Sequence, residues 1–189
     1  PKPGTPFSAV DGLPIGLKDI LQTAGLPTQS GSPIFTGWQA ERDSAVAAAL
    51  RRGGAVLVGK TATTEFAYGA ITPTCNPYDH NRTPGTSSSG SAAAVGAGML
   101  PLAIGTQLMS SVLRPASYCG HVGVKPTYGA IRQDGIHPFS PSGEHVGAHA
   151  HALEDAWQTL RSLAQEAGPL PGSRGLTGPE DAPAATMPK

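Results

Sequence analysis

Two groups of serine residues carry hydroxyl groups that could act in catalysis. The first group surrounds Gly90 before an alanine-rich segment and the second follows a short apolar run: Ser87, Ser88, Ser89, Ser91, Ser110 and Ser111. A serine hydroxyl can act as a nucleophile or pass on a proton when a base lies beside it. Serines before a helix can instead cap it, because their side-chain oxygen accepts hydrogen bonds from free backbone N–H groups. The local sequence leaves both interpretations of the first group open.

Three familiar motifs for phosphate binding or nucleophilic catalysis come close to the first group and do not fit it. Gly85 and Gly90 have the spacing of a P-loop, but Ser91 stands where the phosphate-binding lysine is required. A nucleophile elbow requires G-x-S-x-G, and Ser89 occupies the second glycine position. A Ser-His-Asp triad could be built from distant residues, but no sequence context selects a histidine for it.

Residues 42–54 predict a helix with defined ends. Asp43 can cap its N-terminus, because a side-chain oxygen at that position accepts hydrogen bonds from free N–H groups. Arg51 and Arg52 suit the negative end of the helix dipole, and Gly53 can stop the helix.

Segments of strand and helix character alternate along the chain. These segments are residues 11–21, 55–60 and 101–106 for strands and residues 91–99 and 151–168 for helices. A helix followed by a strand, twice, predicts an α/β fold with a mixed, largely parallel, twisted sheet flanked by helices. Ser110 and Ser111 then come just beyond the carboxyl end of a strand, where open α/β sheets bind their ligands. The two serine-bearing loops can therefore converge.

The composition limits the classes of partner. The 189 residues suit one domain, and 13 Lys and Arg balance 13 Asp and Glu, which leaves a formal net charge of zero. Direct binding to nucleic acid needs a concentrated basic surface, which this charge balance argues against. The most apolar stretch, residues 92–104, is too short to span a bilayer. We therefore expect a cytoplasmic protein that contacts neither nucleic acid nor membrane directly.

The chain is expected to divide into a folded part and a tail. Residues 1–167 form the expected core, and residues 168–189, rich in Pro and Gly and without periodicity, form a disordered or irregular tail. Cys75 and Cys119 are far apart in the sequence, and we expect both to be buried, reduced side chains.

The stretch 84–127 resembles the signature of the amidase signature family, serine hydrolases that cleave carboxamide bonds. The segments that carry the resemblance are, in chain order, GLPIGLKDIL, GAVLVGKTATTEFAYG, PGTSSSGSAAA, GTQLMSS, LRPAS, YCG and GVKPT. The resemblance runs from about Pro6 to Ala167 and implies a partial-length member with the family's sheet truncated. A truncated sheet exposes an edge, which favours self-association or a partner chain.

The resemblance implies a Ser-Ser-Lys triad in place of Ser-His-Asp. By motif position Ser111 is the nucleophile, Ser87 is the bridging serine that follows a cis peptide bond, and Lys18 is the base. A lysine can accept a proton only when it is uncharged, so burial must lower its pKa from about 10.4 by several units. Asp19 follows directly, and in an extended segment it points to the other side, away from the amine.

The loop before the nucleophile departs from the family pattern. The family has Thr-Gly-Gly-Ser or Thr-Ala-Gly-Ser where this chain has Leu108-Met109-Ser110-Ser111, and it has glycine where this chain has Thr86. Backbone amides of Leu108, Met109 and Ser110 are the implied oxyanion hole, and larger side chains could narrow it. Two interpretations follow: a hydrolase with an altered pocket, or a degenerate relative.

The leading hypothesis for function is an amidase that cleaves the C–N bond of a small-molecule carboxamide through an acyl-enzyme, with no cofactor. The alternative is the A-type subunit of an amidotransferase, which acts in a complex on glutamine and misacylated tRNA. Gln107, in place of the aspartate of that subunit, favours the free-standing amidases. A third hypothesis is a catalytically degenerate fragment with a binding role.

Residues 142–153 are a further departure from the family and contain three histidines. His145, His149 and His151 have a spacing that a metal could use, but no cysteine or paired carboxylate completes a site. We therefore expect solvated histidines and no metal. Arg114 is expected to tie the nucleophile loop to a neighbouring carbonyl or carboxylate.

Overall fold

A five-stranded mixed sheet forms the centre of the computed structural model, which describes residues 5–137 and 139–182. The strands, in the order β2-β1-β3-β5-β4 across the sheet, are β1 (Pro14–Lys18), β2 (Val56–Thr61), β3 (Leu102–Gln107), β4 (Val122–Val124) and β5 (His145–Ala150). β1 pairs in parallel with β2 and β3, whereas β5 pairs antiparallel with β3 and β4. The expected strands at 11–21, 55–60 and 101–106 are present, and β4 and β5 complete the sheet.

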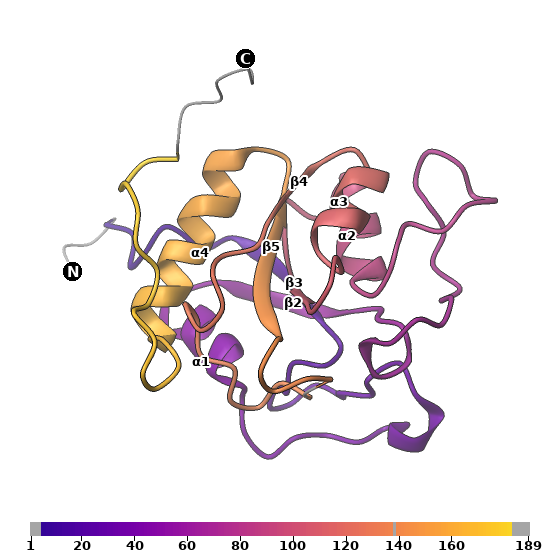
Figure 1. Cartoon of the computed structure of the whole chain (residues 1–189), viewed down its shortest axis with the longest axis horizontal. Coiled ribbons are helices and arrows are strands. Elements are labelled where there is room, and N and C mark those ends of the chain that lie inside the picture. Colours follow the sequence, from indigo (N-terminus) through magenta and orange to yellow (C-terminus); the bar gives the residue numbers. More distant parts are fainter. Residues whose placement is uncertain (1–4, 138, 183–189) are drawn as a thin grey trace.

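Helices cover both faces of the sheet, so the expected mixed α/β fold is confirmed. They are α1 (Ala45–Arg52), α2 (Ser89–Gly96), α3 (Leu113–Tyr118) and α4 (Leu153–Ala167), with short 3-10 turns η1 (Pro33–Phe35) and η2 (Glu65–Ala67). Figure 1 shows α1 and α4 on one side of the sheet and α2 and α3 on the other. The core between α1, α4 and the sheet is aliphatic, because the helices turn apolar stripes inward: Val46, Leu50, Leu160 and Leu163.

The N-terminus of α1 is capped by Ser44, and the expected cap by Asp43 is wrong. The Ser44 hydroxyl accepts a hydrogen bond from the Ala47 N–H at 3.2 Å. Asp43 instead accepts from the Ala24 N–H at 2.7 Å and forms an ion pair with Arg51 at 2.9 Å. Asp43, one position before Ser44, accepts its hydrogen bond from the preceding loop, and the Ser44 hydroxyl accepts from the first turn of the helix.

The two cysteines have different environments. Cys119 is fully buried at the end of α3, as expected, and burial raises the pKa of its thiol to about 11. Cys75 is exposed, so the expectation that both thiols are buried is wrong for this residue. Cys75 lies in the loop between η2 and α2.

Residues 168–182 run along α4 without forming a helix or strand. The Pro179 carbonyl accepts hydrogen bonds from Trp157 Nε1 at 3.1 Å and Arg161 at 2.9 Å, and Leu176 packs against the core. Residues 183–189 of the expected tail lie outside the described residues, and the division at residue 167 stays a prediction. No helix among the described residues has the length and hydropathy needed to cross a bilayer.

The carboxyl ends of β1 and β3 lie at the same edge of the sheet, because the two strands run in parallel with Leu17 opposite Ile104. Lys18 ends β1 and Gln107 ends β3. All six residues of β3 are buried, since the strand has a partner on each side and α2 packed across it. This edge is where the sequence places the lysine and the second serine group.

Candidate active site

Lys18 and Ser87 are in direct contact at the centre of the candidate site. Lys18 Nζ lies 2.7 Å from Ser87 Oγ, and it donates hydrogen bonds to Thr106 Oγ1 at 2.9 Å and the Thr106 carbonyl at 3.3 Å. The lysine is fully buried and Ser87 is 2% exposed. Two residues far apart in the sequence, Lys18 at the end of β1 and Ser87 before α2, therefore share one polar cluster against β3.

The environment of Lys18 favours the uncharged amine. Burial lowers the pKa of Lys18 from 10.5 to about 7, because the charged form loses its hydration, and the charge of Glu144 partly opposes this fall. Asp19 turns away from the cluster and forms an ion pair with Lys60, whose Nζ lies 3.1 Å from Asp19 Oδ1. The orientation expected for Asp19 is thus confirmed.

Glu144 is a buried acid that the sequence analysis did not single out. Its side chain is 3% exposed, and Oε2 has no hydrogen-bond partner among the described residues. Glu144 immediately precedes β5, whose first residue pairs with Gln107 at the end of β3. Its charge therefore acts on the cluster from the antiparallel half of the sheet.

The serines that follow Ser87 fasten α2 to the sheet. Ser88 occupies the N-cap position without a side-chain capping bond; its hydroxyl donates to the Thr106 carbonyl at 3.2 Å and accepts from the Thr106 N–H at 3.3 Å. Ser91 Oγ donates to the Ile104 carbonyl at 3.0 Å. Of the two interpretations of these serines, capping is wrong for Ser88. The hydroxyls instead fix the loop against β3.

Ser111 lies on the adjoining loop between β3 and α3. Its backbone carbonyl accepts a hydrogen bond from the Ser88 N–H at 3.3 Å, which joins the two serine-bearing loops. The side-chain oxygen of Gln107 accepts from the N–H groups of Val112 at 2.8 Å and Leu113 at 3.0 Å, and so fixes the start of α3. Among the described residues, no hydrogen bond joins the hydroxyls of Ser87 and Ser111. The loops meet as expected. Of the three triad candidates, only Lys18 and Ser87 are joined by a side-chain hydrogen bond among the described residues.

Arg114 bridges the two serine-bearing loops. One guanidinium nitrogen donates to the Thr86 carbonyl at 3.0 Å and to Thr86 Oγ1 at 2.6 Å. The expected tie to a neighbouring carbonyl is confirmed. The peptide bond between Thr86 and Ser87 is cis.

The loop of Leu108, Met109 and Ser110 is open to solvent at its centre, where the Met109 side chain is 82% exposed. The backbone N–H groups of Met109, Ser110 and Ser111 donate to no other described residue. Leu108 turns toward Gly143, where an added Cβ would collide with the Leu108 side chain.

His149 is buried, so the expectation of solvated histidines is wrong for this residue. It lies on β5, and its Nδ1 is 2.9 Å from Nε2 of His121, which follows α3. Its Nε2 has no hydrogen-bond partner among the described residues. Burial, with the charges of His121 and Lys18, lowers the pKa of His149 to about 3. His145 is half-buried and His151 exposed, and the described part of the chain holds no cluster of three metal-binding side chains.

Acid is expected to destabilise the fold through His149. The pKa of His149 is lowered in the folded state. Between about pH 6.5 and 3 this histidine therefore binds a proton in the unfolded chain but not in the folded chain. The free energy of unfolding should therefore fall by about 1.4 kcal/mol per pH unit as the pH drops from about 6.5 toward 3. Urea denaturation at a series of pH values measures this slope. His149→Leu should flatten it and exposed His80→Gln should not; an unchanged slope in His149→Leu would contradict the assignment.

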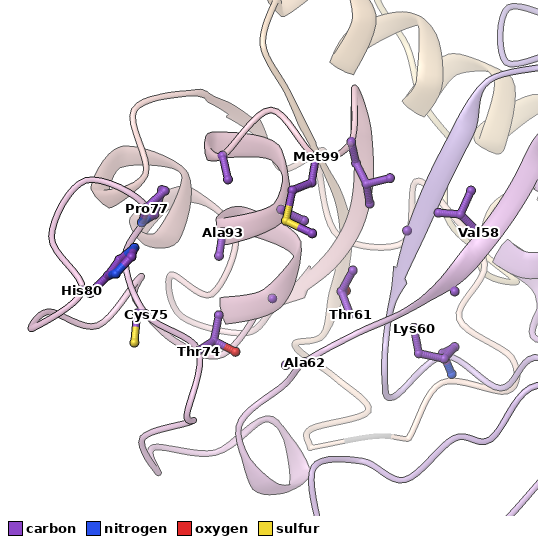
Figure 2. Close-up of a pocket in the computed structure, with 16 residues that line it drawn as sticks. Val58, Lys60, Thr61, Ala62, Thr74, Cys75, Pro77, His80, Ala93 and Met99 are labelled. Carbon is purple, nitrogen blue, oxygen red and sulfur yellow. The ribbon is translucent and has the colours of Figure 1, made fainter.

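Two cavities flank β2. Figure 2 shows the first, of about 540 Å³, between β2 and α2, with Val58 on one wall and Ala93 on the other. The second, of about 620 Å³, lies at the carboxyl end of β2 and has a polar wall that includes Asp19 and Glu65. Lys18, Ser87 and Ser111 are not among the residues that line either cavity. Lys18 and Ser87 are buried, whereas Ser111 is half-buried.

Three polar residues in or near the site were not predicted from the sequence: Thr106, Glu144 and His121. Thr106 lies in a buried apolar run, and a hydroxyl in such a run is a usable signal because it needs a buried partner. Glu144 and His121 gave no signal, since their burial depends on the position of β5, which the sequence did not reveal.

Comparison with known proteins gives the same family throughout. A model of the family described as Amidase matches residues 2–185. The chain is 44% identical over 163 residues to the A-type subunit of glutamyl-tRNA(Gln) amidotransferase from Anaeromyxobacter sp. (strain K), covering 83% of this chain and 33% of that protein. The chain thus spans about a third of the length of the curated relatives it matches.

Solved structures agree with the sequence matches. The chain is similar to the A-type subunit of glutamyl-tRNA(Gln) amidotransferase from Thermotoga maritima, with 35% identity, a TM-score of 0.77 and coverage of 81% of this chain and 36% of that one. It is also similar to the native peptide amidase from Stenotrophomonas maltophilia, with 33% identity, a TM-score of 0.80 and coverage of 88% and 38%. The resemblance inferred from the sequence motifs is confirmed.

Proposed function

The chain belongs to the amidase family, and from this premise we propose that it hydrolyses the C–N bond of a small-molecule carboxamide through Ser111, Ser87 and Lys18. The observation that carries the proposal is the fully buried Lys18, with Nζ 2.7 Å from Ser87 Oγ. An uncharged amine has two N–H groups and one lone pair. The two oxygens of Thr106 accept the N–H groups, which leaves the lone pair for the Ser87 hydroxyl.

The proposed acylation moves one proton along a short path. The Ser111 oxygen attacks the carboxamide carbon as its proton passes to Ser87, and the Ser87 proton passes to Lys18. When the tetrahedral intermediate collapses, Lys18 returns the proton through Ser87 to the leaving nitrogen, which departs as ammonia or an amine. Water then attacks the Ser111 ester by the same path and releases the carboxylic acid. Lys18 can accept the Ser87 proton near neutral pH because its pKa is about 7.

The proposed oxyanion hole is the backbone of Leu108, Met109 and Ser110. Support comes from the N–H groups of Met109 and Ser110, which donate to no other described residue and so remain available to a developing negative charge. The Gln107 side chain, hydrogen-bonded to the N–H groups of Val112 and Leu113, fixes the loop from below. Preorganised donors of this kind are typically worth about 10²–10³ in rate each.

Labelling with a fluorophosphonate tests the proposal, because the reagent forms a covalent bond with an activated serine hydroxyl. We expect the folded chain to gain one adduct, located on Ser111 by mass spectrometry of peptides. Ser111→Ala should carry no adduct, and Ser117→Ala, at an exposed serine of α3, should be labelled like the parent chain. An adduct that survives in Ser111→Ala, or no adduct on the parent chain, would overturn the proposal.

A second candidate function is that of an amidotransferase A-type subunit that acts on glutamine and misacylated tRNA. The 44% identity with the A-type subunit of glutamyl-tRNA(Gln) amidotransferase favours it, while Gln107 in place of the aspartate of that subunit favours a free-standing amidase. Release of ammonia from glutamine only when partner subunits are added would support the amidotransferase. Hydrolysis of simple amides by the chain alone would support the amidase.

A further inference from the structure

The contact between Arg114 and Thr86 joins the residues next to both proposed catalytic serines. Thr86 directly precedes Ser87, and Arg114 lies on the first turn of α3, three positions after Ser111. One guanidinium nitrogen of Arg114 reaches both the carbonyl and the hydroxyl of Thr86. A charged donor held by two acceptors on one residue fixes both the side-chain rotamer and the direction of the carbonyl.

Three further contacts press the same two segments together. A Cβ added to Gly85 would lie 2.8 Å from the Pro115 Cα, so only glycine permits this approach. The Ser88 N–H donates to the Ser111 carbonyl at 3.3 Å, and the Cys119 thiol donates to the Pro84 carbonyl at 3.5 Å. The loop that carries Ser87 and the helix α3 therefore touch on both sides of the Arg114 contact, and small shifts of one segment are transmitted to the other.

The Thr86 hydroxyl is a departure from the family pattern, which has glycine at this position. A glycine at this position would offer Arg114 only the carbonyl, whereas threonine adds a second acceptor at 2.6 Å. Both Thr86 and Arg114 are partly or largely exposed, so the contact contributes little to the free energy of unfolding. The Arg114–Thr86 contact adds little stability, yet it joins the segments that carry Ser87 and Ser111, which must exchange a proton in the proposed reaction. Such a contact is suited to fixing the relative positions of the two serines.

We propose that Arg114 and Thr86 form a positioning pair that orients the Ser87 hydroxyl, already anchored on Lys18, toward Ser111 for proton transfer. The proposal rests on the proposed function. The Thr86 carbonyl belongs to the peptide unit that carries the Ser87 nitrogen, so its direction sets the orientation of Ser87. Arg114 moves with α3 and hence with Ser111. Neither residue touches the reacting atoms in this scheme, so both act through the serines.

The test compares the second-order rate of fluorophosphonate labelling at Ser111 among variants at the two positions. Arg114→Gln and Thr86→Val should each lower the rate by about tenfold to a hundredfold, the scale expected for reacting groups displaced by about 1 Å. Thr86→Ser keeps the second acceptor and should retain the parent rate. The double variant should be no slower than either single one, because each change removes the same contact. Free guanidinium should partly restore the rate of Arg114→Ala.

Arg82→Gln is the matched control, since the exposed Arg82 side chain pairs with Asp79 at 3.0 Å and, among the described residues, donates no hydrogen bond to either serine-bearing loop. Melting temperatures of all variants should stay close to that of the parent chain. Labelling of Arg114→Gln at the Arg82→Gln rate, with Ser111 still the labelled residue, would overturn the positioning pair alone. A rate that falls only with the folded fraction would also overturn it. Absence of labelling in the parent chain would overturn the proposed function as well.

Discussion

Lys18→Met is expected to lower the rate of Ser111 acylation by about 10³–10⁴, the upper range for removal of a general base. Methionine keeps most of the volume of the buried side chain but cannot take up the proton from Ser87. Amide hydrolysis and fluorophosphonate labelling near pH 8 measure the loss. Lys125→Met removes a lysine whose Nζ contacts the Pro126 carbonyl, and it should leave the rate unchanged.

The pH dependence of the parent chain provides the second part of this test. With a Lys18 pKa of about 7, the rate should rise with pH as one proton leaves and level off above about pH 8. Below pH 7 the amine is charged and cannot accept a proton. A rate that rises only near pH 10, or that survives in Lys18→Met, would contradict Lys18 as the base.

The same lysine is expected to make the protein more stable as the pH rises above 7. The pKa of Lys18 is 10.5 in the unfolded chain and about 7 in the folded one, so between these values the unfolded chain binds more protons. Stability therefore increases with pH across this window, by roughly 5 kcal/mol at 1.36 kcal/mol per pKa unit. Urea denaturation near pH 7 and near pH 10 measures the change.

Lys18→Met is the reference for this measurement, because it lacks the titrating amine. Burial also lowers the pKa of Lys60 and raises that of the Cys119 thiol, but both groups remain in the variant, so the difference between the two proteins isolates Lys18. Near pH 7 the variant should be the more stable protein, although it is the less active one. Equal slopes in the parent chain and the variant would contradict an uncharged buried lysine.

The helices α1, α2 and α4 and the parallel strands of the fold could be predicted from the sequence because their signals are local, whereas the short helix α3 was not predicted. Apolar runs predict β2 and β3, and the apolar spacing at residues 153–167 predicts α4. β5 escaped prediction because histidines interrupt its apolar pattern, and His149 is buried only because β5 lies between β3 and β4. Tertiary position, and not the local pattern, determines its environment.

The candidate site was predictable only in part. Motif order selects Lys18, Ser87 and Ser111, and the structure brings the first two within 2.7 Å. No local pattern around Lys18 could have indicated that contact, since it depends on how β1 and β3 align. The hydroxyls of Ser88 and Ser91 show the opposite case. Ser88 stands before a helix, which favours capping, and Ser91 lies in the first turn of that helix, yet both hydroxyls donate to buried carbonyls of β3.

The separation along the chain between Lys18 and its partners has a consequence for the order of assembly. Ser88 and Thr106 are 18 positions apart, so α2 and β3 can bring the two serine loops together through a short closure. Lys18 lies 69 positions from Ser87 and 88 from Thr106, and its arrival requires β1 to dock in parallel beside β3. Long closures are entropically slower than short ones. A chain in which β1 has not yet docked carries both serines without their base, so reactivity requires this long-range pairing.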